Sequence, residues 1–346
     1  MPMNIRFLYL LLNTLITFSA TNCGLKTVSE SQHNFTKING LSYAAANVLI
    51  DSTDIISITD IGANWVALMP YGFIREGENK LIFNSEKQWI SETTEGITKD
   101  ILIYKEANLK IMLKPHVWIS HGVYTGDFEL EKEEDWVEFE KGYKDYILTF
   151  AKIAQEHNVE LFCIGTEWRK FIKNRPDFWH QLIRDVRIVY RGKLTYAANW
   201  DEYIETPFWN EMDYIGVNGY FPLTDKVNPS LKELELAWYP TIKKLEEVSI
   251  KNQKLILFTE YGYRSIEGTT IRPWESYTKV KHSMAEQEIA LQALYNSTWS
   301  EAWFAGGFLW KWFNKSMIRG GEDHSGYTPQ NKPAAVIVRN HYGANH

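Results

Sequence analysis

Two glutamates follow apolar stretches of strand length and are candidates for acid–base chemistry. Glu167 lies near the end of VELFCIGTEW, and Glu260 follows the apolar stretch KLILFT. Two carboxyl groups roughly 5 to 5.5 Å apart can cleave a glycosidic bond with retention if one stays protonated and the other stays ionised. One such glutamate alone is weak evidence, because many strand-end carboxylates are solvated or paired with a helix cap. The pair predicts glycoside cleavage if the fold brings both residues together.

Aromatic and polar residues end other apolar stretches and are candidates for substrate binding. Flat rings suit the apolar faces of sugars, and the chain has 14 Trp and 19 Tyr, although many of these rings are expected in the core. Strand alternation predicts that Trp310 and Trp312 share a face, and it favours Trp312, which is nearer the strand end. The candidate binding residues are His116, Trp118, Asn199, Trp200, Tyr220, Trp310 and Trp312.

Eight apolar stretches that alternate with helical segments are predicted to form strands. This alternation is typical of parallel strands with crossover connections, and eight is the number at which such a sheet closes. We therefore predict an α/β fold, a single (β/α)8 TIM barrel, with its active site at the carboxyl ends of the strands. Glu167 and Glu260 would then end the fourth and seventh strands. The predicted strands span residues 40–45, 65–69, 110–118, 159–165, 193–199, 212–218, 254–259 and 307–312.

Helix periodicity between these strands supports the barrel. Residues 133–157 carry an apolar stripe from Trp136 to Ile153, and residues 176–190 begin with Pro176, which suits a helix start. A weaker helix at 49–61 and a short one at 202–210 complete the alternation. The alternative is a doubly wound open sheet, but no Gly-rich phosphate loop follows Ala45. The remaining predicted helices span 94–107, 229–248, 284–300 and 333–340.

Composition and charge narrow the classes of function. The fractions of apolar and charged residues, 45% and 23%, are those of an ordinary globular protein. The net charge of −6 provides no basic field for nucleic acid or anionic lipid, so we expect neither as a partner. Cys23 and Cys163 are the only cysteines and are not expected to pair, because Cys23 lies where a signal peptide would be cut.

The first residues have the outline of an export signal. Arg6 precedes an apolar run that ends near Phe18, which is too short for a spanning helix. We divide the chain into a signal peptide (1–23), a polar leader (24–37) and a barrel domain (38–346). Cys23 resembles a lipidated cysteine, although Asn22 stands where Gly or Ala is usual, so lipid anchoring and simple secretion both stay open. We expect an exported monomer in the periplasm, at the cell surface or outside the cell.

Three sequence motifs resemble those of a known enzyme family. GTEW, LFTEYGYRS and SGYTPQNKPA are similar to glycoside hydrolase family 113 of clan A, over about residues 38–342. The resemblance implies a retaining β-1,4-mannanase, with Glu167 as acid/base and Glu260 as nucleophile. It also implies that Tyr220 hydrogen-bonds the nucleophile. The resemblance further implies that His116 and Trp118 form the wall of the site at the third strand. It implies that Trp310 or Trp312 is the platform under the sugar at the cleavage point.

One position departs from the wider clan. Most clan members have Asn immediately before the acid, where it contacts the sugar 2-hydroxyl, and here the residue is Thr166. The family shares this feature, so Thr166 supports the narrower resemblance. Asn199 or Asn218 could supply the missing contact.

Three other functions are possible for such a chain. A metal hydrolase would need ligands at strand ends, but no HxH or HxxxH spacing follows the first strand, and we expect no metal or cofactor. A surface glycan-binding protein without turnover would have no chemical need for two neighbouring carboxylates. A clan A glycosidase acting on another β-linked polysaccharide stays open, because aromatic walls fit any such chain.

Overall fold

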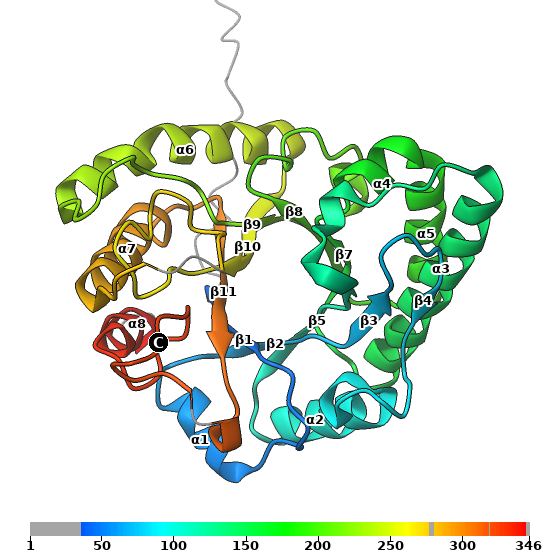
Figure 1. Cartoon of the computed structure of the whole chain (residues 1–346), viewed down its shortest axis with the longest axis horizontal. Helices are drawn as coiled ribbons and strands as arrows, with labels where there is room; N and C mark the ends of the chain where they lie inside the picture. The colour runs from blue at the N-terminus through cyan, green and yellow to red at the C-terminus, as the bar shows by residue number, and fades with distance from the viewer. Residues whose placement is uncertain (1–35, 277–279, 318, 344–346) are drawn as a thin grey trace, which may run out of the picture.

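The computed structural model describes residues 36–276, 280–317 and 319–343, and its centre is a closed barrel. Eight parallel strands follow one another around the barrel in the order β1-β11-β10-β9-β8-β7-β5-β2, with the helices outside them (Figure 1). The predicted (β/α)8 fold is confirmed. The barrel strands are β1 Ile38–Tyr43, β2 Trp65–Leu68, β5 Lys110–Leu113, β7 Leu161–Thr166, β8 Lys193–Asn199, β9 Tyr214–Asn218, β10 Leu255–Tyr261 and β11 Phe304–Trp312.

Eight α-helices in the described part of the chain surround the strands. Two of them, α4 and α5, follow β7, whereas β8 is followed only by turns and the short 3₁₀ helix η5 (Trp209–Glu211). The helix predicted at 202–210 is therefore wrong, and Pro207 within it lacks the N–H that a helix interior needs. The helices are α1 Ser52–Thr59, α2 Thr94–Glu106, α3 Glu133–Glu156, α4 Arg169–Asn174, α5 Pro176–Val189, α6 Leu231–Asn252, α7 Met284–Thr298 and α8 Ala334–Gly343.

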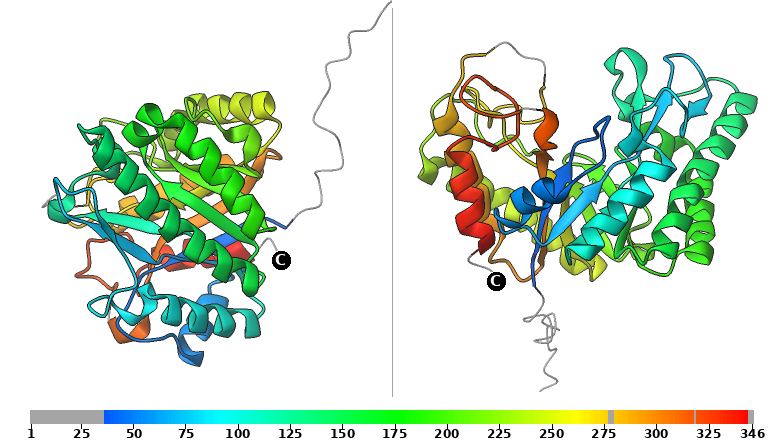
Figure 2. Two further views of the ribbon diagram at one scale, coloured as in Figure 1. Left: turned by 90° about the vertical axis from the view of Figure 1, so that its right-hand side faces the viewer. Right: turned by 90° about the horizontal axis from the view of Figure 1, so that it is seen from below.

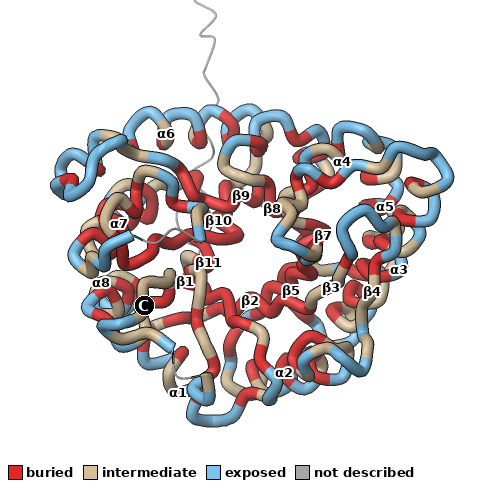
Figure 3. Tube along the Cα trace, viewed as in Figure 1, coloured by how far each residue is buried: buried red, intermediate tan, exposed pale blue. Residues whose placement is uncertain are grey.

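The core forms two layers because alternate strand residues face opposite sides of the barrel wall. Leu161 and Cys163 of β7 belong to the apolar cluster inside the barrel, whereas Phe162 and Ile164 pack outside it, under the helices. Burial is concentrated on the strands and on the inner faces of the helices (Figure 3). Cys163 is a fully buried free thiol, so it is a packing residue of the barrel interior.

The strand predicted at 110–118 is two strands. β5 ends at Leu113, Lys114 and Pro115 follow, and β6 (His116–Ile119) then pairs with β3 (Tyr71–Ile74) outside the barrel. β2 and β3 are separated in the same way by Met69 and Pro70. Proline cannot donate to a strand ladder, so both barrel strands end at equivalent points. With β4 (Leu81–Ile82), β3 and β6 form a three-stranded sheet beside the barrel mouth (Figure 2).

The predicted signal peptide, with Cys23, and most of the leader lie outside the described residues. No helix in the described part of the chain is long and apolar enough to cross a membrane.

Candidate active site

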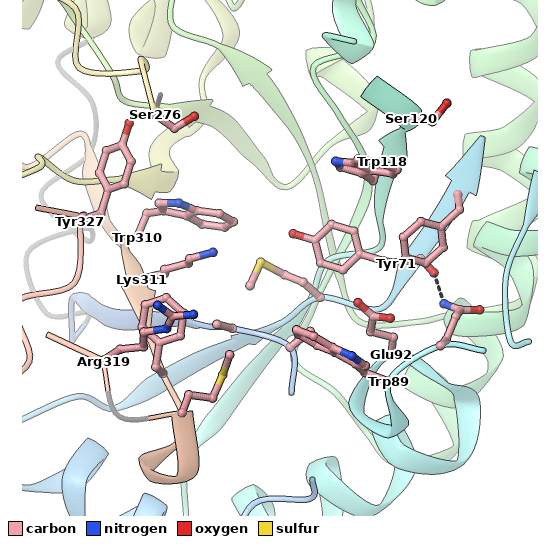
Figure 4. Close-up of a pocket in the computed structure, with 18 of the residues that line it drawn as sticks. Tyr71, Trp89, Glu92, Trp118, Ser120, Ser276, Trp310, Lys311, Arg319 and Tyr327 are labelled. Carbon is pink, nitrogen blue, oxygen red and sulfur yellow. Dashed lines mark hydrogen bonds between the residues drawn. The ribbon is translucent and has the colours of Figure 1, made fainter. Parts of the chain in front are cut away.

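A cleft lies over the carboxyl ends of the barrel strands, and its two parts share Ser276, Trp310 and Tyr327. The smaller part, of about 560 Å³, contains Glu167 and Glu260. The larger part, of about 1380 Å³, extends over β1, β3 and β6 (Figure 4). An open cleft of this size can hold several units of a chain-like ligand.

Glu167 enters the cleft through an unusual backbone conformation at the end of β7. Its φ is +56°, in the left-handed region that non-glycine residues seldom adopt, and its amide donates to Ala197 O at 2.9 Å. Just before it, a Cβ at Gly165 would lie 2.7 Å from the Tyr143 hydroxyl oxygen, so only glycine fits against the helices. Trp168 faces away from the cleft and is buried in the outer layer. The turn thus separates neighbouring residues onto two faces.

Glu260 of β10 is buried and is held by two side chains that follow the ends of β5 and β9. Lys114 Nζ lies 2.5 Å from its Oε1, with no exposed surface on the lysine side chain. The Tyr220 hydroxyl donates to Oε2 at 2.9 Å. His116 Nε2 lies 3.5 Å from Oε1. The carboxylate therefore has a counter-charge and a neutral hydrogen-bond donor, both of which favour negative charge at this place.

Asn218, at the end of β9, links the two glutamates. Its Nδ2 donates to Glu167 Oε1 at 2.8 Å, and its Oδ1 accepts from Thr259 Oγ1 at 2.8 Å. Lys114 Nζ is 3.5 Å from the same Oδ1. These contacts orient the amide, because its oxygen faces two donors and its nitrogen faces a carboxyl. The two carboxyl groups are thus connected through one continuous polar network.

Two groups at the cleft have strongly shifted pKa values. Burial, and secondly the charge of Glu260, raise the pKa of Glu167 to about 8. Burial, and secondly the charge of Lys114, hold the pKa of His116 well below its usual value. At neutral pH the site therefore combines a protonated Glu167 with a neutral imidazole.

Aromatic rings line both parts of the cleft. Trp310 lies where they meet, with the His116 ring stacked at a centroid distance of 6.0 Å. Trp118 of β6 lines the larger part and is 45% exposed. Trp200 lines the smaller part, stacked on Trp274 at 5.1 Å, with Asn199 beside it. Exposed rings along a groove offer flat surfaces for sugar rings.

The family of the chain follows from its sequence. A family model for glycoside hydrolase family 113 matches residues 48–332 of the 346. The chain belongs to glycoside hydrolase family 113. The resemblance seen in the sequence motifs is confirmed, and the protein is a glycoside hydrolase. No curated protein sequence matches the chain.

Solved structures similar to this family 113 hydrolase support the same fold. The family 113 β-mannanase AaManA from Alicyclobacillus acidocaldarius, in complex with ManMIm, is 23% identical with a TM-score of 0.79, covering 90% of this chain and 99% of that one. A family 113 β-1,4-mannanase is 23% identical with a TM-score of 0.77, covering 90% and 100%. A β-glucuronidase from Faecalibacterium prausnitzii is 13% identical with a TM-score of 0.59, covering 89% and 49%.

One predicted binding residue of the family 113 hydrolase lies away from the cleft. Trp312 is 5% exposed, and its Nε1 donates to Ser57 Oγ of α1 at 3.1 Å. Along β11, Trp310 pairs with Ser42 and Trp312 with Tyr43, which leaves Lys311 without a partner on β1. The extra residue is a β-bulge, and it cancels the alternation that predicted a shared face. Trp310, and not Trp312, lines the cleft.

Sequence reasoning missed several residues of this family 113 site. Lys114 lies at a predicted strand end but was given no role. A lysine next to an apolar stretch is an available signal, because a lysine that is fully buried needs a partner. Tyr71, Trp274 and Tyr327 line the cleft from loops and from the second sheet, and no sequence pattern distinguished them. In the described residues, no group of three or more His, Cys, Asp or Glu side chains is arranged to hold a metal ion.

Proposed function

We propose that the protein is a retaining hydrolase that cleaves β-1,4-linked mannan or mannooligosaccharides by double displacement. The observation that carries this proposal is the unequal environment of Glu167 and Glu260 within one cleft. Glu167 has a pKa raised to about 8, mainly by burial, whereas Glu260 is bound by Lys114 and Tyr220. Two carboxyl groups held in opposite protonation states are what a retaining glycosidase requires.

In the first step Glu167 acts as general acid and Glu260 as nucleophile. The Glu167 proton passes to the glycosidic oxygen as the bond to the anomeric carbon breaks, and a Glu260 oxygen bonds to that carbon. The product is a glycosyl ester of Glu260 and a shortened sugar chain. Tyr220 holds Oε2 at 2.9 Å, and Lys114 lies 2.5 Å from Oε1. These contacts position the nucleophile before the substrate arrives.

In the second step Glu167 acts as general base toward water. Formation of the ester removes the negative charge of Glu260, which is the second cause of the raised pKa of Glu167. The pKa of Glu167 should therefore fall in the intermediate, so that the ionised carboxylate can accept a proton from water. Water then attacks the anomeric carbon, the ester bond breaks, and the configuration is retained.

The substrate class rests on the aromatic cleft and on the family. Trp310, Trp118 and Trp200 offer ring surfaces to a β-linked chain, and two similar solved structures of the family are named as β-mannanases. Asn199 lines the smaller part of the cleft, whereas Asn218 is buried with its amide bound to Glu167 and Thr259, so Asn199 is our candidate for the 2-hydroxyl contact. Rates on mannan, glucomannan, galactomannan, cellulose and xylan would test this substrate choice.

The test of the proposed roles is substitution of each glutamate. Glu167→Ala and Glu260→Ala should each lower turnover of mannohexaose by at least about a thousandfold with little change in melting temperature. Glu205→Ala, at an exposed residue, is the matched control and should keep wild-type turnover. Proton NMR early in the wild-type reaction should show retention. An inverted product, or near-wild-type turnover by either cleft variant, would refute the assignment.

We also propose that residues 1–23 direct export, either to a lipid anchor at Cys23 or to simple secretion, and that the protein is a monomer. The support for export is the charged and apolar pattern of the first residues, and the support for the anchor is the position of Cys23. Incorporation of labelled palmitate would test the anchor; an unlabelled, fully soluble mature protein would leave simple secretion. These proposals concern location and assembly, and the cleft chemistry does not depend on them.

A further inference from the structure

The two parts of the cleft differ in charge. The larger part is lined by five cationic side chains and only two carboxyl groups, although the whole chain has a net charge of −6. One of those carboxyls, Glu92, is buried, and burial raises its pKa. The cationic residues are Arg75, Lys87, Arg264, Lys311 and Arg319. When charges of one sign line a cleft, they raise the local concentration of ligands of the opposite charge.

Of these five cations, Lys311 lies next to Trp310, where the two parts of the cleft meet. It is the bulge residue of β11, adjacent to Trp310, and its ammonium lies over the rings of Trp310 and Phe313 at 5.0 and 5.2 Å. In the part of the chain that the structure describes, Lys311 Nζ makes no ion pair or hydrogen bond, and the charge of Glu260 acts on it from a distance. Burial lowers the pKa of Lys311. An ammonium that has lost water without gaining an acceptor is poised to bind one.

Arg319 adds a second cation at the same place. Its guanidinium lies over the Phe313 ring at 5.9 Å, so both cations contact one aromatic side chain. Their charges repel. Burial is the main cause of the lowered pKa of Lys311, and the charge of Arg319 lowers it further. Figure 4 shows Lys311 and Arg319 on the same wall of the cleft, facing Trp89 and Glu92 on the other wall. An anion between the two cations would relieve this repulsion.

The smaller part of the cleft has no such excess of cations. Glu167, Glu260 and Asp201 line it, with Arg169 as the lining cation. A sugar that carries a negative group would be repelled there by Glu260 and favoured over Lys311 and Arg319. The charge pattern therefore defines where along a bound chain an acidic unit fits.

We propose that Lys311 and Arg319 bind an anionic substituent, a carboxylate or a sulfate ester, on a sugar unit next to the one that lies against Trp310. The substrate would be a β-linked glycan with acidic units, cleaved beside a neutral one. This inference rests on the proposed glycosidase function and narrows its substrate class. A neutral hydroxyl could also accept from Lys311, but it would not compensate two neighbouring positive charges.

The test compares three substrates with one backbone. Mannohexaose is the neutral probe, partly C6-oxidised mannohexaose carries carboxylates, and partly sulfated mannohexaose carries sulfate esters. We expect kcat/KM for at least one acidic probe to exceed that for mannohexaose by about tenfold at low salt. Salt at 0.5 M should reduce this advantage by screening. The better acidic probe identifies the anion.

Variants at Lys311 test whether the preference depends on its charge. Lys311→Met should lower the ratio of kcat/KM, acidic over neutral, by about tenfold. Lys311→Arg, which keeps the charge, should retain most of the ratio and guards against a folding defect. Lys315→Met is the matched control: it removes the same charge from an exposed residue outside the cleft, and the ratio should not change.

The outcomes separate this inference from the proposed function. Cleavage of mannohexaose without preference for either acidic probe would overturn the anion site alone. So would a Lys311→Met variant whose ratio matches the wild type, since Lys311 would then bind only neutral hydroxyls. Cleavage of none of the three probes would overturn the proposed function, and the substrate class with it.

Discussion

At the scale of single residues, the unusual feature of the site is a lysine without solvent contact beside a glutamate. Lys114 has no exposed side-chain surface, and its Nζ contacts Glu260 Oε1, Thr259 O and Asn218 Oδ1. A buried ion pair contributes little net stability, because both charges lose water. Its value here is electrostatic: a positive charge is already in place beside Glu260, the proposed nucleophile, and it also opposes the raised pKa of Glu167.

This arrangement predicts a change in the pH profile when Lys114 is removed. Lys114→Met should lower kcat by about a hundredfold or more, because Glu260 loses its buried counter-charge. Activity requires protonated Glu167, so it falls as pH rises through the pKa of about 8. Lys114 is one of the groups that lower this pKa, so its removal should move the basic limb of the kcat/KM profile to higher pH.

The control for this prediction lies on the same strand. Lys110→Met removes an exposed lysine at the start of β5, far along the strand from the cleft, and should leave the profile unchanged. A lysine that only stabilised the fold would, when replaced, lower the melting temperature without moving the limb. That result would contradict the electrostatic role.

At the scale of elements, small irregularities in the strands build the cleft. Pro70 and Pro115 end two barrel strands, after which β3 and β6 pair outside the barrel. Tyr71 and Trp118 of these strands line the larger part of the cleft. In β11 a single extra residue, Lys311, turns Trp310 toward the cleft and Trp312 toward α1. Each irregularity redirects aromatic side chains that a regular strand would place elsewhere.

The bulge predicts opposite consequences for two tryptophans of one strand. Trp310→Ala should lower kcat/KM on mannohexaose by at least about tenfold while changing stability little, because this ring is partly exposed and faces the cleft. Trp312→Ala should reduce the free energy of unfolding by about 3–5 kcal/mol through loss of a buried ring. Chemical denaturation and steady-state kinetics on both variants measure the two effects. If Trp312→Ala lost activity without losing stability, the described orientation would be wrong.

At the scale of the whole molecule, several carboxyl groups are buried with raised pKa values. Burial raises the pKa of Glu167 to about 8 and that of Asp100 on α2 to about 7, with the charge of another carboxylate as a further cause in each case. Such groups favour the folded state when protonated and oppose it when ionised. The stability that they contribute is present below their unfolded pKa values and is lost as pH rises toward 7 and 8.

Asp100 provides a direct test of this pH dependence, because it is outside the cleft. Asp100 is 2% exposed, and its Oδ1 accepts from the amide of Ile50. Asp100→Asn keeps an acceptor but cannot ionise, so this variant should melt several degrees above wild type at pH 8 and close to it at pH 4. Asp60→Asn, at an exposed residue, serves as the control and should match wild type at both values. Equal melting temperatures of wild type and Asp100→Asn at pH 8 would contradict the raised pKa.

The sequence alone determined the fold class, and it predicted that two glutamates lie at the same end of the barrel. Buried parallel strands must be apolar on both faces, so the eight strands read as apolar runs in the sequence, and the helices between them show their own period. The carboxyl ends of barrel strands meet at one face, so the sequence positions of Glu167 and Glu260 already place both side chains there. These properties depend on local patterns and on a general rule of the fold.

Only the tertiary structure decided which neighbouring side chains enter the cleft. Trp310 and Trp312 have the same local pattern, and the bulge that separates them depends on pairing with β1, which is distant in the sequence. Lys114 contacts Asn218 and Glu260 because β9 and β10 bring these residues against it. The shifted pKa of Glu167 depends on burial by surrounding elements, and sequence spacing does not specify such burial.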